Sequence, residues 1–368
     1  MAADDHAILV GISRYADAAV FPELRGPFND VALVRHWLTS PDGGGLDPAN
    51  VTTILSPRRL APDVEPDDVP PVTEDFKRAF KRVVRDAEGR VTRRDARLYL
   101  YFSGHGFCER KSLNPQGALY AANATRDFPE NIYGTFYALS ARDKALFSEI
   151  VLVMDCCRDA EVNRSPDIPP INEAGVGAAT TVKLLCIYAA PKGGKAQERP
   201  IAERGGKVFG LLTHALCKAL TEAVPDAGNH ISATALRDHL LGTWKEVCGA
   251  EAAPAPEVVL PTTAEDLLLR SGNAGVECRF VLADHPGAPV ALELTDGALR
   301  PVARCELRRP PETSTVRRGS AEPRPLAFDG ERFALDLQPG FYRYALSGAL
   351  ARQALFAVES AGGDDVRL

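Results

Sequence analysis

The chain has 368 residues, of which 45% are hydrophobic and 25% charged, the proportions of a soluble globular protein. This length exceeds one ordinary domain and predicts two. The net charge of -6 gives no basic footprint, so nucleic acid is a poor first candidate for a partner, and no apolar run approaches the roughly 18 residues of a membrane span. The first residues lack the positively charged region of a signal peptide, so we expect a cytoplasmic protein with no nucleic-acid or membrane partner.

Strand and helix signals alternate through the first 250 residues. Short apolar runs predict strands at residues 6–12, 51–55, 96–102, 149–154 and 184–189. Apolar residues at helical spacing predict helices at residues 28–38, 73–84, 208–223 and 233–247. Because the strands are apolar on both faces and are separated by helices, the pattern predicts an α/β fold, with a mostly parallel sheet flanked by helices.

The pattern changes after residue 250. Residues 251–274 begin with a stretch rich in Ala and Pro, which is typical of a linker or an extended crossover. From residue 275 to residue 368, short alternating strands with Pro and Gly at their turns replace the helical period. They predict a small all-β sandwich of about 95 residues. We therefore expect a first domain over 1–250, a crossover over 251–274 and an accessory domain over 275–368.

The cysteines show no sign of a disulfide framework or a metal site. There are eight, scattered without a regular spacing, and no second C-x-x-C or H-x-x-x-H element completes four zinc ligands. We expect reduced thiols and no bound metal. The adjacent pair Cys156 and Cys157 stands apart, because it follows a predicted strand directly.

Two short motifs lie where predicted parallel strands end, the edge at which open α/β sheets bind ligands. In Tyr101–Gly106 (YFSGHG), His105 stands between two glycines, so its ring is presented from a loop. In Val153–Asp159 (VMDCCRD), a buried strand delivers a thiol to the same edge. Alone, the first motif is compatible with an ordinary turn and the second with core packing. Together and in this order, they favour a catalytic pair.

A thiol and an imidazole at one sheet edge can hydrolyse an amide. The thiolate attacks the carbonyl carbon, and the imidazole lowers the thiol pKa or protonates the leaving amine. The resulting oxyanion needs donors, for which the backbone N–H groups of Gly106 and Cys157 are candidates. Three functions remain open: an endopeptidase, an amidase acting on small substrates, and an idle scaffold that binds a partner through its C-terminal domain.

With these motifs the chain resembles the caspase-like cysteine peptidases, in particular the metacaspases and bacterial caspase homologues of the caspase–hemoglobinase fold. The resemblance covers about residues 5–248 and includes two supporting stretches, Leu24–Asp30 (LRGPFND) and Phe209–Thr213 (FGLLT). The separation of His105 and Cys157 fits the roughly 50 residues between the catalytic residues of caspases. The family pattern D-x-C implies that Cys157 is the nucleophile, with His105 as its partner, in a cysteine endopeptidase acting on protein substrates.

The resemblance also implies an acidic S1 pocket, formed by Asp30 and Asp155 with Ser103 beside them. Two carboxylates favour a cationic P1 side chain, above all arginine, whose planar fork binds a carboxylate through two hydrogen bonds. The alternative role for Asp30 is that of a negative charge near the N-terminus of the predicted helix 28–38, where the helix dipole favours it. Asn123 stands where an acid often occurs in metacaspases, so the acidic calcium cluster is not recognisable and we expect no cofactor.

Regulation by cleavage is a further implication of the resemblance. The segment 158–179 follows the nucleophile, is rich in Pro, Gly and acids, and contains Arg164. The segment 107–117 after the histidine contains Arg110 and Lys111. We expect a latent protease that is cut at Arg164 or a nearby basic residue, by itself or by an activating protease, in a bacterial stress, cell-death or defence pathway. A loop with no regulatory role is the alternative.

Overall fold

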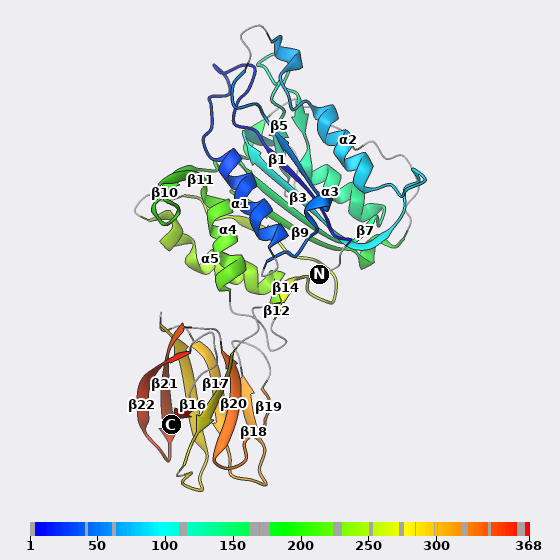
Figure 1. The fold of residues 1–368 in the computed structure, drawn as a ribbon. Helices are drawn as coiled ribbons and strands as arrows, with labels where there is room; N and C mark the ends of the chain where they lie inside the picture. The colour runs from blue at the N-terminus through cyan, green and yellow to red at the C-terminus, as the bar shows by residue number, and fades with distance from the viewer. Residues whose placement is uncertain are drawn as a thin grey trace. The chain divides into compact units, whose positions relative to one another are not determined.

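The computed structural model divides the chain into two compact units (Figure 1). The first comprises residues 1–223 and 232–269, and the second comprises residues 224–231 and 270–368. The structure describes residues 4–40, 43–60, 64–109, 116–161, 169, 177–223, 230–249, 253–271, 276–283, 285–297, 299, 301–317, 323–337, 340–358 and 365–368.

A six-stranded sheet with the order β13-β9-β7-β3-β1-β2 forms the centre of the first unit. Its strands are β1 (His6–Gly11), β2 (Val51–Leu55), β3 (Arg94–Gly104), β7 (Phe147–Cys156), β9 (Lys183–Tyr188) and β13 (Glu257–Val259). The first five are parallel to their neighbours, and β13 runs antiparallel to β9. The predicted mostly parallel sheet is therefore confirmed. The crossover expected at 251–274 contributes an edge strand to it.

Helices cover both faces of this sheet, as the apolar strands predicted. They are α1 (Pro27–Thr39), α2 (Thr73–Val83), α3 (Gly134–Asp143), α4 (Leu211–Glu222) and α5 (Ala233–Cys248). Successive strand residues point to opposite faces. Leu100 packs in one cluster with Phe76 of α2 and Tyr137 of α3, whereas its neighbour Tyr101 lines an enclosed apolar cavity with residues of α1, α4 and α5.

Smaller elements surround the central sheet, and two small sheets among them lie at the C-terminal ends of its parallel strands. A four-stranded sheet has the order β6-β5-β4-β8, from β4 (Gly106–Glu109), β5 (Ala118–Tyr120), β6 (Asn131–Ile132) and β8 (Asp159–Glu161). A hairpin pairs β10 (Glu198–Ile201) with β11 (Lys207–Gly210). The remaining short elements are the 3-10 turns η1 (Pro48–Asn50), η2 (Pro66–Asp68), η3 (Ala179–Thr181) and η4 (Ala202–Arg204), and the strands β12 (His230–Ser232) and β14 (Leu268–Ser271).

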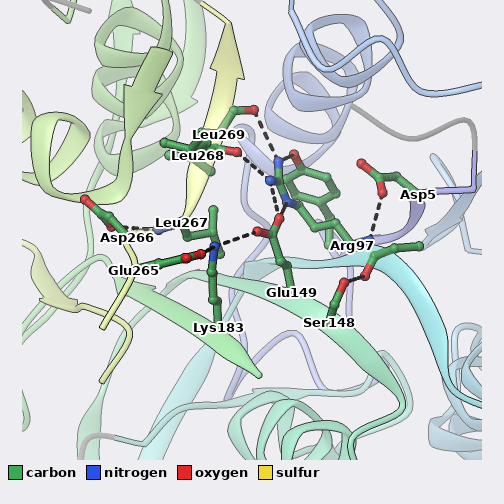
Figure 2. Close-up of polar contacts among 12 residues, drawn as sticks. Asp5, Arg97, Ser148, Glu149, Lys183, Glu265, Asp266, Leu267, Leu268 and Leu269 are labelled. Atoms are coloured by element: carbon green, nitrogen blue, oxygen red, sulfur yellow. Dashed lines mark hydrogen bonds and ion pairs between the residues drawn. The ribbon is translucent and has the colours of Figure 1, made fainter. Parts of the chain in front are cut away.

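A charged network ties the segment after α5 to the starts of the parallel strands (Figure 2). The buried Arg97 of β3 donates from Nε to Glu149 of β7 at 2.9 Å and from Nη2 to the Leu268 carbonyl at 2.5 Å. Lys183 of β9 lies 3.6 Å from Glu149 and 3.4 Å from Glu265. Because Arg97 is surrounded by acceptors, its burial is compensated, and residues 265–269 are held to the sheet.

The second unit is an all-β domain, as predicted. Its strands are β15 (Val276–Val281), β16 (Val290–Asp296), β17 (Pro301–Leu307), β18 (Ser314–Arg317), β19 (Arg324–Leu326), β20 (Arg332–Leu337), β21 (Gly340–Gly348), β22 (Arg352–Val358) and β23 (Val366–Arg367). They form two sheets, β20-β15-β23 and β19-β18-β17-β16-β21-β22. Alternate residues such as Phe280, Leu292 and Phe333 form one shared core, which is the packing of a β-sandwich.

Candidate active site

The register of two neighbouring strands brings His105 and Cys157 to the same edge of the sheet. Strands β3 and β7 are parallel, and their last paired residues are Gly104 and Cys156. His105 and Cys157 directly follow this pair. Because hydrogen-bonded strands lie about 4.8 Å apart, the two residues leave the sheet side by side.

The two glycines beside His105 are required by close packing. A Cβ at Gly104, where φ is +156°, would lie 2.7 Å from the Tyr15 hydroxyl. A Cβ at Gly106 would lie 2.5 Å from Cys156 Sγ and 2.5 Å from the Ala118 carbonyl oxygen. All three distances are shorter than real Cβ contacts allow, so a side chain at either position would displace the histidine segment.

His105 is held by a backbone carbonyl and by aromatic rings. Its Nε2 lies 2.8 Å from the Pro22 carbonyl oxygen, which can only accept, so Nε2 carries a proton and Nδ1 is the basic nitrogen. The Tyr15 hydroxyl accepts the His105 backbone N–H at 2.8 Å, and the rings of Tyr15 and Phe21 lie 5.1 and 5.9 Å from the imidazole. Burial lowers the pKa of His105, which favours the neutral base.

Cys157 is the accessible thiol of the adjacent pair. Cys156 is 1% exposed and belongs to the core, whereas Cys157 is half-buried. The Cys157 thiol lies 3.8 Å from the Ala196 carbonyl oxygen. Burial raises the pKa of Cys157, with Lys195 acting in the opposite direction, so the free thiol stays protonated at neutral pH. A neighbouring base is therefore needed to generate the thiolate.

The three expected pocket residues are brought together behind this edge. Ser103 Oγ donates to Asp30 Oδ2 at 2.8 Å, and Ser103 is paired in register with Asp155 across β3 and β7. Asp30 also accepts the Gly210 N–H at 2.9 Å. Thr213 donates to Asp155 Oδ2 from its backbone N–H at 2.9 Å and from its hydroxyl at 2.6 Å. Asp30 also lies in the first turn of α1, the position of its alternative role.

Burial makes these two carboxyls weaker acids than usual, and no cationic side chain is paired with them in the part of the chain that the structure describes. Burial raises the pKa of Asp30 well above its usual range, and the negative charge of Asp155 raises it further. Burial also raises the pKa of Asp155, to about 6, against the lowering effect of the Thr213 hydrogen bonds. An entering cation would stabilise both ionised carboxylates.

The two supporting stretches, LRGPFND and FGLLT, make contacts with segments that are distant in the sequence. Asn29 Nδ2 donates to the Val208 carbonyl at 2.8 Å, which fixes the start of α1 against the β10–β11 hairpin. Gly210 and Thr213, in the FGLLT stretch, bind the two aspartates. Glu198, which accepts from the backbone N–H of Gly26 at 2.7 Å, was missed because no local pattern marks it.

Arg158 follows the nucleophile and is completely buried. It donates from Nε to the Gln116 carbonyl at 2.6 Å and from Nη1 to the Ala190 carbonyl at 2.9 Å, and Nη1 is also paired with Glu257 of β13. Its guanidinium lies 4.3 Å from the centre of the Tyr188 ring. Nη2 has no hydrogen-bond partner among the described residues. The residue thus links the nucleophile segment to the edge strand of the sheet.

Some expected features lie outside the described residues. These include Arg110, Lys111 and Arg164. Within the described ranges, no group of three or more His, Cys, Asp or Glu side chains is arranged to hold a metal ion. None of the helices in the described part of the chain is both long and apolar enough to cross a membrane.

Sequence comparisons with known proteins agree with the motifs. The family model for the caspase domain matches residues 4–245. A protein from a Desulfuromonadales bacterium, named as a probable protease, is 30% identical over 164 residues, which is 42% of this chain and 18% of that relative. The chain thus matches less than a fifth of the relative's length. A crystal structure of a Geobacter sulfurreducens protein covers 73% of this chain and 97% of its own, with 11% identity and a TM-score of 0.43.

Proposed function

This chain belongs to the caspase family of peptidases, and we propose that it is a cysteine endopeptidase with Cys157 as nucleophile and His105 as general base. The observation that carries the proposal is the register of β3 and β7, which pairs Gly104 with Cys156. The two reactive residues follow that pair, one on each strand. Adjacent delivery of a base and a thiol is the requirement for nucleophilic catalysis.

The reaction follows from the contacts of the pair. His105 Nε2 is committed to the Pro22 carbonyl, so Nδ1 accepts the Cys157 proton as Sγ bonds to the substrate carbonyl carbon. The oxyanion accepts the N–H groups of Gly106 and Cys157. The imidazolium then protonates the leaving amine, the C–N bond breaks, and a thioester remains. Water, deprotonated by His105, hydrolyses the thioester and restores the thiol.

The substrate carries a basic residue at P1, with arginine preferred. Asp30 and Asp155 are buried, which raises their pKa values, and no cationic side chain among the described residues is paired with them. A guanidinium supplies a cation and several N–H donors, and Ser103 supplies a further acceptor. An acidic P1 residue would instead add a third negative charge to the pocket.

The enzyme is made in a latent form that is activated by a cut after the nucleophile. Arg164 is the favoured position within the segment 158–179. Lys183, another basic residue nearby, begins β9 and lies 3.6 Å from Glu149, so it is held in the sheet and is a poor cleavage site. The likeness to metacaspases and bacterial caspase homologues supports a role for this activation in a stress, cell-death or defence pathway. Arg164→Ala tests it: full activation of that variant would contradict cleavage at this position.

The central test uses matched cysteine variants of the full chain. An Arg-based electrophilic peptide probe should label the wild type and Cys156→Ala but not Cys157→Ala, because Cys156 is buried in the core. Fluorogenic peptides with Arg at P1 should be cleaved in preference to those with Asp. If the probe labels Cys157→Ala as strongly as the wild type, the assignment of Cys157 as the nucleophile is refuted. A preference for peptides with Asp at P1 would refute the assignment of Asp30 and Asp155 to the P1 pocket.

A further inference from the structure

Glu198 is an acid outside the sequence motifs, and it lies beside the pocket of Asp30 and Asp155. It is the first residue of β10, and its register partner on β11 is Gly210. The Gly210 N–H donates to Asp30, and a Cβ at Gly210 would lie 2.1 Å from Asp155 Oδ2. The hairpin therefore places Glu198 opposite the glycine that contacts both aspartates.

Backbone donors at the start of α1 fix the Glu198 carboxylate. The Arg25 N–H donates to Oε1 at 3.0 Å, and the Gly26 N–H donates to Oε2 at 2.7 Å. A Cβ at Gly26 would lie 2.9 Å from Glu198 Oε2 and 3.2 Å from Asp30 Oδ2. The carboxylates of Glu198 and Asp30 thus flank one glycine, and any side chain there would enter the space between them.

Glu198 is also the acid that solvent reaches. Asp30 is 1% exposed and Asp155 5% exposed, whereas Glu198 is half-buried. Among the residues that the structure describes, the carboxylates accept from backbone N–H groups and hydroxyls, and none is paired with a lysine or arginine side chain. Burial is the largest influence on the pKa values of the two aspartates and of His105, which it raises and lowers respectively. The charge of Glu198 acts in the upward direction on all three, so its field reaches the pocket and the catalytic base alike.

We propose that Glu198 is a third acid of the P1 pocket, which meets the substrate cation at the pocket entrance and selects basic over neutral side chains. This inference rests on the proposed endopeptidase function. Asp30 and Asp155 form the floor of the same pocket. Because the backbone N–H groups of Arg25 and Gly26 hold the Glu198 carboxylate in place before binding, little side-chain entropy is lost when the cation arrives.

The test compares the full-chain variants Glu198→Gln and Glu203→Gln. Glu203 is an exposed acid in the turn of the same hairpin and serves as the matched control. Peptides carry Arg, Lys or the uncharged isostere citrulline at P1. Loss of one charge-assisted contact should raise KM for the Arg and Lys peptides about tenfold or more in Glu198→Gln, with kcat within about twofold. Citrulline peptides and Glu203→Gln should behave like the wild type.

Two failures are distinguishable. If the activated wild type, cut in the segment 158–179, reacts at Cys157 with a simple thiol probe but cleaves no basic P1 peptide, the proposed specificity fails and this inference fails with it. The second failure leaves the proposed function intact: the wild type prefers Arg, but Glu198→Gln loses activity equally toward Arg and citrulline peptides and melts at a lower temperature. In that case Glu198 only caps α1, and the inference alone is overturned. If the glutamine variant does not fold, Glu198→Asp takes its place in the test. This substitution shortens the side chain by one methylene and moves the charge away from the substrate, so KM for the Arg peptide should still rise several-fold. An unchanged KM overturns the inference.

Discussion

Removing the charge of Glu257 should reveal the cost of keeping Arg158 buried. The arginine is 0% exposed, and Glu257, whose side chain is 33% exposed, is its ion-pair partner. Glu257→Gln keeps the shape of the side chain and removes its negative charge. The guanidinium then retains the carbonyls of Gln116 and Ala190 and the Tyr188 ring, but no counter-ion among the described residues.

The expected loss is a large share of the stability of the first unit. Breaking a buried ion pair by removing one partner typically costs about 3–5 kcal/mol, because the other charge is left uncompensated. Two carbonyls remain, and Glu257 is partly reached by water, so we expect about 2–3 kcal/mol. Arg158→Met removes both the charge and the orphaned Nη2, and the double variant should be more stable than Glu257→Gln alone.

Both tryptophans of the chain, Trp37 and Trp244, lie in the first unit, so their fluorescence follows its unfolding specifically. Urea titration of the wild type, both single variants and the double variant completes a thermodynamic cycle. A free energy of unfolding for Glu257→Gln within about 0.5 kcal/mol of the wild type would refute the argument that the pair compensates a buried charge.

Three other predictions concern the active site itself. Gly106→Ala should reduce kcat/KM by about a hundredfold or more, measured with an Arg peptide, because the new Cβ would collide with Cys156; near-normal activity would contradict the packing argument. Tyr15→Phe removes the acceptor of the His105 N–H and should lower the free energy of unfolding by about 1–3 kcal/mol in urea titrations, whereas an unchanged value would show that water replaces the hydroxyl. The raised pKa of Asp155, about 6, means that the folded state binds its proton more tightly than the unfolded chain, so this stabilisation is present at low pH and is lost as the pH rises through about 6. Measured against Asp155→Asn, the wild type should lose up to ~3 kcal/mol of relative stability between pH 4 and pH 8; a flat difference would show that the carboxyl is not perturbed.

Local patterns were sufficient for most of the fold. The apolar strands and amphipathic helices of the first unit predicted the parallel sheet, because burial on both faces leaves a clear signature in sequence. The helix α3 was missed, since it begins at Gly134 and mixes small, polar and aromatic residues. The strand β13 was also missed, because its three residues are too few to show a period and they follow an Ala- and Pro-rich stretch.

The candidate site was predictable only where its residues belong to motifs. His105 and Cys157 were placed at strand ends by sequence, and the register of β3 and β7 then brings them together. Glu198 and Glu257 carry no local signal, because each gains its role from a contact with a distant segment. Glu198 meets the start of α1, and Glu257 meets Arg158 on the far side of the nucleophile. Such roles arise from tertiary packing.

The contacts of β13 and of Leu268 and Leu269 decide where this chain can be shortened. The family match ends at residue 245. A chain shortened to residues 4–245 would lack Glu257, so the charge of Arg158 would lose its ion-pair partner. It would also lose the Leu268 and Leu269 carbonyls that accept from Arg97 (Figure 2). A truncation meant to isolate the peptidase from the sandwich should therefore extend to about residue 269, where the first compact unit ends.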